Sequence, residues 1–356
     1  MIKSRWHLSD VMPCSRRQPV ARWRALLIGL CLGVLATAGV QSAFAQSYKI
    51  TQAGFRVLYM GPIFVALDTG LFKARDVDFT FTEIDSGALG MAAVLSGDAQ
   101  ISDLDVLGVA QVKKQGKSPL MIYNLVDRVT LDLVVRNEAL KKIGVDVKAP
   151  VLERAKALKG LNIGITRAGA PTDIYARYFL VKAGLDPERD ATLIQIGGVP
   201  ALDTAFRSGR IDAFLLSPPL PQTLENAGVG TILIRNTAGE MPDLTDTSYD
   251  ALFTTADYAR SNGPALKAYA HAVQDSVKWI KGHRDEALKL LGEKWFKDTK
   301  PESLALSLDA LMPAVSESGT FTEAALRKYL NVFKSIGQGV DADLREGDLW
   351  TNEFVK

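Results

Sequence analysis

The same pattern of strands and helices occurs twice in the middle of the chain, and this duplication limits the fold more than any other feature. In each copy a strand and a helix lead to a Gly-Leu pair, and a second strand and helix lead to a Ser-Gly pair before a third strand. Gly70-Leu71 aligns with Gly184-Leu185 and Ser96-Gly97 with Ser208-Gly209, at offsets of 114 and 112 residues. Strands that alternate with helices predict parallel sheets with right-handed crossovers. We therefore expect an α/β protein with two lobes.

Short apolar runs predict the strands, and amphipathic segments between start and stop signals predict the helices. In the first copy we expect strands at residues 55–59, 77–84 and 99–104, and in the second copy at residues 163–166, 191–196 and 211–216. Four further strands are expected at residues 120–125, 131–135, 231–234 and 251–255. Helices are expected at residues 264–281, 284–295, 301–311 and 322–336, and we expect them to pack on the first lobe.

Two polar segments without clean periodicity are interpreted as connections between the lobes. The charged segment at residues 136–159 leads into the second lobe, and the Thr- and Asp-rich segment at residues 235–248 leads back. The predicted organisation is therefore a first lobe formed by residues 46–136 and 249–356, and a second lobe formed by residues 137–248.

The first 45 residues have the pattern of a secretory signal. Four arginines at positions 16, 17, 22 and 24 precede an apolar stretch at residues 25–40, and Ala43-Phe44-Ala45 supplies the small residues of a cleavage site. The apolar stretch is shorter than the ~20 residues of a membrane span. We expect cleavage after Ala45, a mature chain that starts at Gln46, and a periplasmic location. The pair Arg16-Arg17 leaves twin-arginine export open beside the general secretory route.

The composition of the expected mature chain excludes several classes of function. It carries 36 basic and 39 acidic side chains, a balance that disfavours nucleic acid as a partner. Both cysteines lie in the expected signal, and the remaining histidines, His271 and His283, lie in an amphipathic run at residues 264–295. A solvated helix face is the simplest role for them. We therefore expect no disulfide, no metal site, no cofactor and no catalytic residue.

Several local patterns carry a family resemblance. They are FVALDTGLFK at residues 64–73, SGDAQI at 96–101, LKG at 158–160, AGLD at 183–186 and SGRIDA at 208–213. In this order and spacing they resemble the periplasmic solute-binding proteins of ABC importers, in the branch for sulfonates, taurine, nitrate and thiamine-precursor pyrimidines. The resemblance covers about residues 48–295. One departure is Ser217-Pro218-Pro219-Leu220, where the family often has an aromatic residue and an acid, so the ligand class is not simply carried over.

The resemblance implies a fold and a role. The fold is the two-lobed type II periplasmic binding protein fold, with a mixed sheet flanked by helices in each lobe and a ligand cleft between them. Such proteins close on a small-molecule ligand by hinge motion. The implied role is that of a monomeric receptor that delivers its ligand to an inner-membrane ABC permease with its ATPase. The implied ligand is a small polar organic molecule such as a sulfonate, a carboxylate or a related anion.

Candidate ligand residues follow from the general position of sites in open α/β sheets, which lie outside the carboxyl ends of the strands and near helix N-termini. We expect ligand contacts from residues at such turns: Tyr59, Met60, Ser86, Gly87, Asp103, Arg128, Arg167, Gly169, Thr172 and Ser217.

The loop Arg167–Thr172 is the strongest candidate for an anion, because Gly169 allows close backbone approach, Thr172 offers a hydroxyl and Arg167 can pair with a carboxylate or sulfonate. The alternative is that Thr172 only caps its helix and Arg167 is solvated. Tyr59 can stack on a ligand. Asp103, on the same face as Asp105, can accept from an amine or cap the next helix. A ligand with both acidic and donor groups, such as an amino-sulfonate, would satisfy Arg167 and Asp103 together.

Three other functions share this fold. The first is a receptor for a pyrimidine or another heterocycle, and the second is a receptor that feeds a sensor rather than a permease. The third is an enzyme similar to the family's pyrimidine-synthase relatives. That chemistry calls for a histidine and a cysteine-rich motif, and the expected mature chain contains no cysteine. We therefore expect a binding protein rather than an enzyme.

Overall fold

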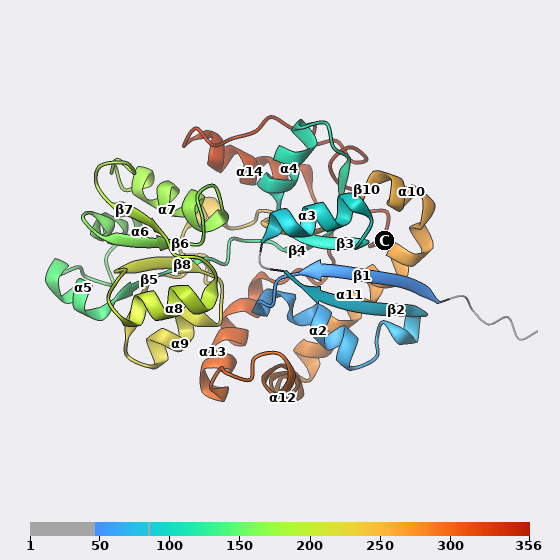
Figure 1. The fold of residues 1–356 in the computed structure, drawn as a ribbon, viewed down its shortest axis with the longest axis horizontal. Coiled ribbons are helices and arrows are strands. Elements are labelled where there is room, and N and C mark those ends of the chain that lie inside the picture. The colour runs from blue at the N-terminus through green and yellow to red at the C-terminus, as the bar shows by residue number, and fades with distance from the viewer. Residues whose placement is uncertain (1–46, 85) are drawn as a thin grey trace, which may run out of the picture. The chain divides into compact units, whose positions relative to one another are not determined.

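The computed structural model describes residues 47–84 and 86–356, and Ser47–Lys356 forms one compact unit. The expected signal segment, its cleavage site and Gln46 lie outside the described residues. The unit contains two five-stranded mixed sheets, with the strand orders β2-β1-β3-β10-β4 and β7-β6-β8-β5-β9 (Figure 1). The two-lobed α/β fold expected from the duplication is thus confirmed. None of the helices in the described residues has the length and apolar character of a membrane span.

The first sheet is built from the first copy of the repeat and one strand from later in the chain. Its parallel strands are β1 (Tyr48–Gly54), β2 (Val77–Glu83) and β3 (Ile101–Asp105). Strand β10 (Asp250–Thr255) pairs antiparallel with both β3 and β4 (Pro119–Val126). The helices that connect these strands are α2 (Gly61–Asp68), α3 (Gly87–Ser96) and α4 (Val106–Lys114).

The second sheet has the same arrangement. Its strands are β6 (Asn162–Ile165), β7 (Thr192–Gln195), β8 (Ala213–Leu216), β9 (Gly230–Ile234) and β5 (Asp132–Arg136), of which β5 is antiparallel to β8 and β9. The helices in this half are α5 (Asn137–Ile143), α6 (Val151–Ala155), α7 (Pro171–Lys182), α8 (Val199–Arg207) and α9 (Leu220–Asn226). Strands β5 and β10 hold equivalent places in the two sheets. Along the chain, β5 is the next strand after β4 of the first sheet, and β10 is the next strand after β9 of the second sheet.

This exchange of strands corrects the predicted lobe boundary. We expected the strand at 131–135 in the first lobe and the crossing after residue 136. Strand β5 instead pairs with β8 and β9 of the second sheet, so the chain crosses at residues 127–131. The change to charged residues after 136 marks helix α5 and not the crossing. The return crossing lies at residues 235–249 and contains a short 3-10 helix, Pro242–Leu244.

The first predicted strand was also wrong. Residues 55–59 were expected to be β, but the strand is Tyr48–Gly54, and Leu58–Met60 forms a 3-10 helix that continues into α2. An apolar run does not by itself distinguish a buried strand from the start of a buried helix. The true strand looks polar because it contains Gln52, which is fully buried and accepts a hydrogen bond from the Tyr269 hydroxyl.

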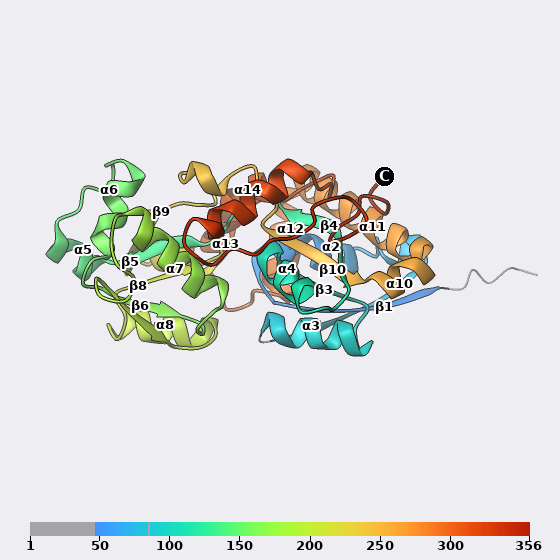
Figure 2. The same ribbon diagram turned by 90° about the horizontal axis from the view of Figure 1, so that it is seen from above.

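The four C-terminal helices are confirmed as α11 (Gly263–Gly282), α12 (Arg284–Lys294), α13 (Pro301–Leu311) and α14 (Glu323–Lys334); a short helix before them, α10 (Ala256–Ser261), was not expected. Helices α11 and α12 pack on α2 of the first lobe, as expected. Helix α13 also packs on α9 of the second lobe, where Asn226 Nδ2 donates to Ser303 Oγ at 3.1 Å. Both views show α13 and α14 where the two sheets meet (Figures 1 and 2).

Candidate functional site

Three carboxyl groups meet at one end of the first sheet. Asp103 and Asp105 lie two residues apart in β3, so their side chains point to the same face. Asp250 begins β10 and lies directly opposite Asp105 in the antiparallel register, which places it on that face too. All three are buried, with 0%, 7% and 4% of their surface exposed for Asp103, Asp105 and Asp250. This end of β3 is its carboxyl end, where ligands bind in open α/β sheets.

The three groups differ in how their oxygens are used. Asp105 caps helix α4 by accepting from the backbone N–H of Gly108 at 2.6 Å. Asp103 Oδ2 accepts from the Tyr59 hydroxyl at 3.3 Å, whereas its Oδ1 is buried and has no partner in the described part of the chain. Asp250 receives no hydrogen bond within the described residues, and its Oδ1 is buried. Asp105 is therefore structural, while Asp103 and Asp250 have unused acceptor capacity.

Their environment favours the neutral form of each carboxyl group. Burial raises the pKa of Asp103 to about 7, although the hydrogen bond from Tyr59 opposes the shift. Burial also raises the pKa of Asp105 to about 6. The pKa of Asp250 lies well above its usual range because of burial and of the negative charges of Asp103 and Asp105. Within the described part of the chain, no lysine or arginine offsets these shifts. Among the described residues, no group of three or more His, Cys, Asp or Glu side chains is arranged to hold a metal ion.

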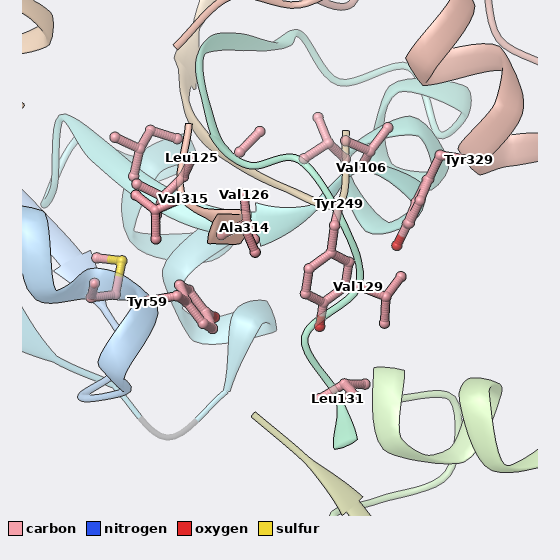
Figure 3. Close-up of a cluster of buried hydrophobic side chains, with 14 of the residues drawn as sticks. Tyr59, Val106, Leu125, Val126, Val129, Leu131, Tyr249, Ala314, Val315 and Tyr329 are labelled. Carbon is pink, nitrogen blue, oxygen red and sulfur yellow. The ribbon is translucent and has the colours of Figure 1, made fainter. Parts of the chain in front are cut away.

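Tyrosine side chains border the carboxyl groups and connect the two lobes. Tyr249 immediately precedes Asp250, and Figure 3 shows its hydroxyl pointing toward Leu131. Tyr175 of α7 packs edge-on against Tyr249, with ring centroids 6.1 Å apart. The Tyr175 hydroxyl donates to the Tyr329 hydroxyl of α14 at 3.2 Å. A residue from the second lobe thus lies in the same aromatic cluster as the strand that carries Asp250.

The predicted anion loop, Arg167–Thr172, lies at the N-terminus of α7. Arg167 is exposed. Gly169 has a φ of 74°, and its N–H donates to Asp173 Oδ2 at 2.8 Å. Thr172 is buried, and its hydroxyl accepts from the Thr166 N–H at 2.9 Å rather than capping the helix, whose N-cap is Ala170. A carboxylate of the protein itself therefore occupies the place where an external anion was expected, and the anion site stays a prediction.

The remaining candidates on the first lobe have structural contacts. Ser86 is the N-cap of α3 and accepts from the Leu89 N–H at 3.4 Å. Gly87 lies against Leu104, and a Cβ at this position would overlap that side chain. Met60 is fully buried beside Tyr59. These contacts explain the residue types without a ligand.

Arg128 and Ser217 both lie at the crossing between the sheets. Arg128 donates to the carbonyl oxygens of Pro313 at 3.3 Å and Thr237 at 3.5 Å. Ser217, at the end of β8, is paired with the Thr130 hydroxyl at 2.7 Å and is 5% exposed. Of the predicted residues, the structure brings Tyr59, Met60 and Asp103 together, and it places the others elsewhere.

Sequence reasoning missed Asp250 and Tyr249. The sequence places them more than a hundred residues after Asp103, at the end of a polar loop. The sequence pattern that could have indicated them is an acidic residue at the start of an apolar strand. This pattern points to the site only when β10 is known to insert beside β3, which no local pattern encodes.

Comparisons with known proteins agree with this architecture. Residues 47–292 match the NMT1-like family. The putative binding protein YtlA of Bacillus subtilis is 23% identical over 264 residues, which cover 73% of this chain and 74% of YtlA. The nitrate/nitrite binding protein NrtA of Synechococcus elongatus is 27% identical over 291 residues, which cover 75% of this chain but only 64% of NrtA. The alkanesulfonate-binding protein SsuA of Xanthomonas axonopodis, solved with MOPS, has a TM-score of 0.66 at 16% identity, covering 83% of this chain and 96% of SsuA. The chain therefore belongs to the NMT1-like family and has the periplasmic binding protein fold.

Proposed function

We propose that this chain is the periplasmic solute-binding component of an ABC importer. It captures a small polar organic molecule between its two lobes and delivers it to an inner-membrane permease. It acts as a monomer and performs no chemistry on its ligand. The family membership supports the general role, since NrtA and SsuA are named for the small solutes that they bind.

The observation that carries the proposal is the group of unpaired polar atoms where β3 and β10 meet. Among the residues that the structure describes, Asp103 Oδ1 and Asp250 Oδ1 are buried and have no hydrogen-bond partner. Buried polar atoms are nearly always paired in native proteins, and exceptions need an explanation such as a missing partner. Their position, at the carboxyl end of β3, is where this class of sheet binds ligands. A small molecule with matching polar groups would supply the missing partners.

Hinge closure is supported by the connectivity. Two segments cross between the sheets, residues 127–131 and 235–249, and two-lobed proteins of this kind bend at such crossings. Helix α14 and α7 are joined beside the crossings by the Tyr175–Tyr329 hydrogen bond.

A ligand screen on the purified exported protein tests the proposal. A ligand at about 100 times its Kd stabilises the folded state by roughly 2.7 kcal/mol, which raises the melting temperature by several degrees. Small-angle scattering of the same sample should show a smaller radius with ligand. The panel contains nitrate, methanesulfonate, benzoate, benzylamine, benzamidine, choline and an aminopyrimidine. If no compound raises the melting temperature by more than about a degree, the proposal fails.

A further inference from the structure

The proposed function leaves the chemical class of the ligand open, and this inference rests on that function. We propose that the ligand is a small organic cation, whose protonated amine or amidine group binds between Asp103 and Asp250 and is flanked by the rings of Tyr59 and Tyr249.

The unused acceptors support a donor-rich, positively charged group. Asp103 Oδ1 and Asp250 Oδ1 are both buried and find no partner in residues 47–84 and 86–356, and the two residues lie on adjacent strands on one face of the sheet. An ammonium or amidinium group carries several N–H donors and a positive charge, so one such group can pair with both oxygens. Burial also strengthens this pairing relative to the same contact in water.

Tyr249 provides an observation that does not depend on the acids. Only 4% of its surface is exposed, and its hydroxyl has no hydrogen-bond partner within the described residues. Figure 3 shows this hydroxyl pointing toward Leu131, away from the strand that carries Val126. The hydroxyl oxygen is not among the fully buried unpaired atoms of the described residues, so it borders space that a ligand can reach. The rings of the two tyrosines also suit a cation, because the face of an aromatic ring attracts positive charge.

The charges in the site oppose an anion such as those named for NrtA and SsuA. Asp103, Asp105 and Asp250 form a cluster that no lysine or arginine of the described residues neutralises. A nitrate or sulfonate in this place would meet like charge from any ionised carboxyl group, whereas a bound cation favours the ionised form of these groups and pairs with it. The alternative anion position, at the N-terminus of α7, already holds the Asp173 carboxylate.

Calorimetric titration of the full exported chain tests the inference with defined probes. The cations are benzylamine, benzamidine and choline, and the anions are nitrate, methanesulfonate and benzoate. The variants are Asp103→Asn and Asp250→Asn, which keep the side-chain shape and remove the charge. Asp78→Asn is the matched control, because Asp78 is exposed on β2 of the same sheet and loses the same charge. Arg167→Ala tests the competing anion loop.

We expect at least one cation to bind and its affinity to fall at least tenfold in both carboxyl variants, with no change in Asp78→Asn or Arg167→Ala. Thermal melts of the free proteins should show the two carboxyl variants folded, so that weaker binding reports the site itself. Binding of an anion, with affinity lost only in Arg167→Ala, overturns the inference and leaves the proposed function standing. Cation binding that is unchanged in both carboxyl variants overturns the inference as well. If no probe binds, both proposals fail.

Discussion

Replacing Asp103 by asparagine should change how the stability of the protein depends on pH. In the unfolded chain this carboxyl group has a pKa near 3.8, whereas burial raises the pKa of Asp103 in the folded state to about 7. Between these values the folded state holds a proton that the unfolded state has lost. The unfolded state then binds fewer protons, so the free energy of unfolding falls as the pH rises from about 4 to about 7.

The size of the effect follows from the two pKa values. They differ by about 3, and a tenfold change in proton affinity corresponds to about 1.4 kcal/mol, so the full loss above pH 7 is about 4 kcal/mol. Roughly 3 kcal/mol of this loss falls between pH 5 and pH 8. Asp103→Asn has no proton to lose and keeps an acceptor for the Tyr59 hydroxyl. We therefore compare the free energy of unfolding of Asp103→Asn with that of wild type at each pH. The difference should shift in favour of the variant by about 3 kcal/mol between pH 5 and pH 8.

Urea unfolding at pH 5 and pH 8, followed by tryptophan fluorescence, measures the difference. Asp250 and Asp105 face Asp103, and the negative charge of Asp103 raises the pKa of Asp250, so the comparison between the two proteins reports Asp103 together with its effect on Asp250. Asp78→Asn should follow wild type at both pH values, because Asp78 is exposed. If Asp103→Asn and wild type differ by the same amount at pH 5 and pH 8, the carboxyl group is not shifted and the reasoning about the buried cluster is refuted.

Two further predictions concern packing. Tyr175→Phe removes the hydroxyl that bonds to Tyr329, which should lower the free energy of unfolding by about 1–2 kcal/mol, seen as a lower midpoint in urea; an unchanged midpoint would contradict a stabilising contact between the lobes. Gly319→Ala should cost about 2–4 kcal/mol in the same assay, because Gly319 has a φ of 69° and a Cβ there would overlap the Tyr123 ring. Gly282→Ala is its control and should be neutral or stabilising by up to about 1 kcal/mol, since this helical position has open space around it; equal losses in both variants would argue against the overlap.

Most of the elements could be predicted from local pattern, but their pairing could not. Apolar runs followed by Gly-containing exits located β2, β3 and the strands of the second copy to within a few residues. Strand β1 was missed because its polar Gln52 finds its partner in a helix more than two hundred residues away. Strands β5 and β10 were found as strands, yet their exchange between sheets depends on tertiary packing that a single strand does not encode.

For the candidate site, too, some residues could be predicted from local pattern and others could not. Tyr59 and Asp103 could be predicted because they belong to turns at strand ends, where general rules place ligands. Asp250 and Tyr249 could not, since only the insertion of β10 beside β3 brings them to the same place. Thr172 was predicted to contact a ligand or to cap its helix. Its hydroxyl instead accepts a hydrogen bond from the Thr166 N–H.

The place of β10 also has a consequence for the order in which the protein can fold. All five strands of the second sheet come from one continuous stretch, Asp132–Ile234, so this half can assemble as soon as that stretch is complete. The first sheet lacks its fourth strand until Asp250–Thr255 has been made, and β4 joins that sheet only through β10. During synthesis the edges of β3 and β4 must stay without their partner while the whole second half is added. A fragment that ends before Asp250 would therefore hold one complete lobe, made of its later residues, and leave its earliest residues as an open, aggregation-prone sheet.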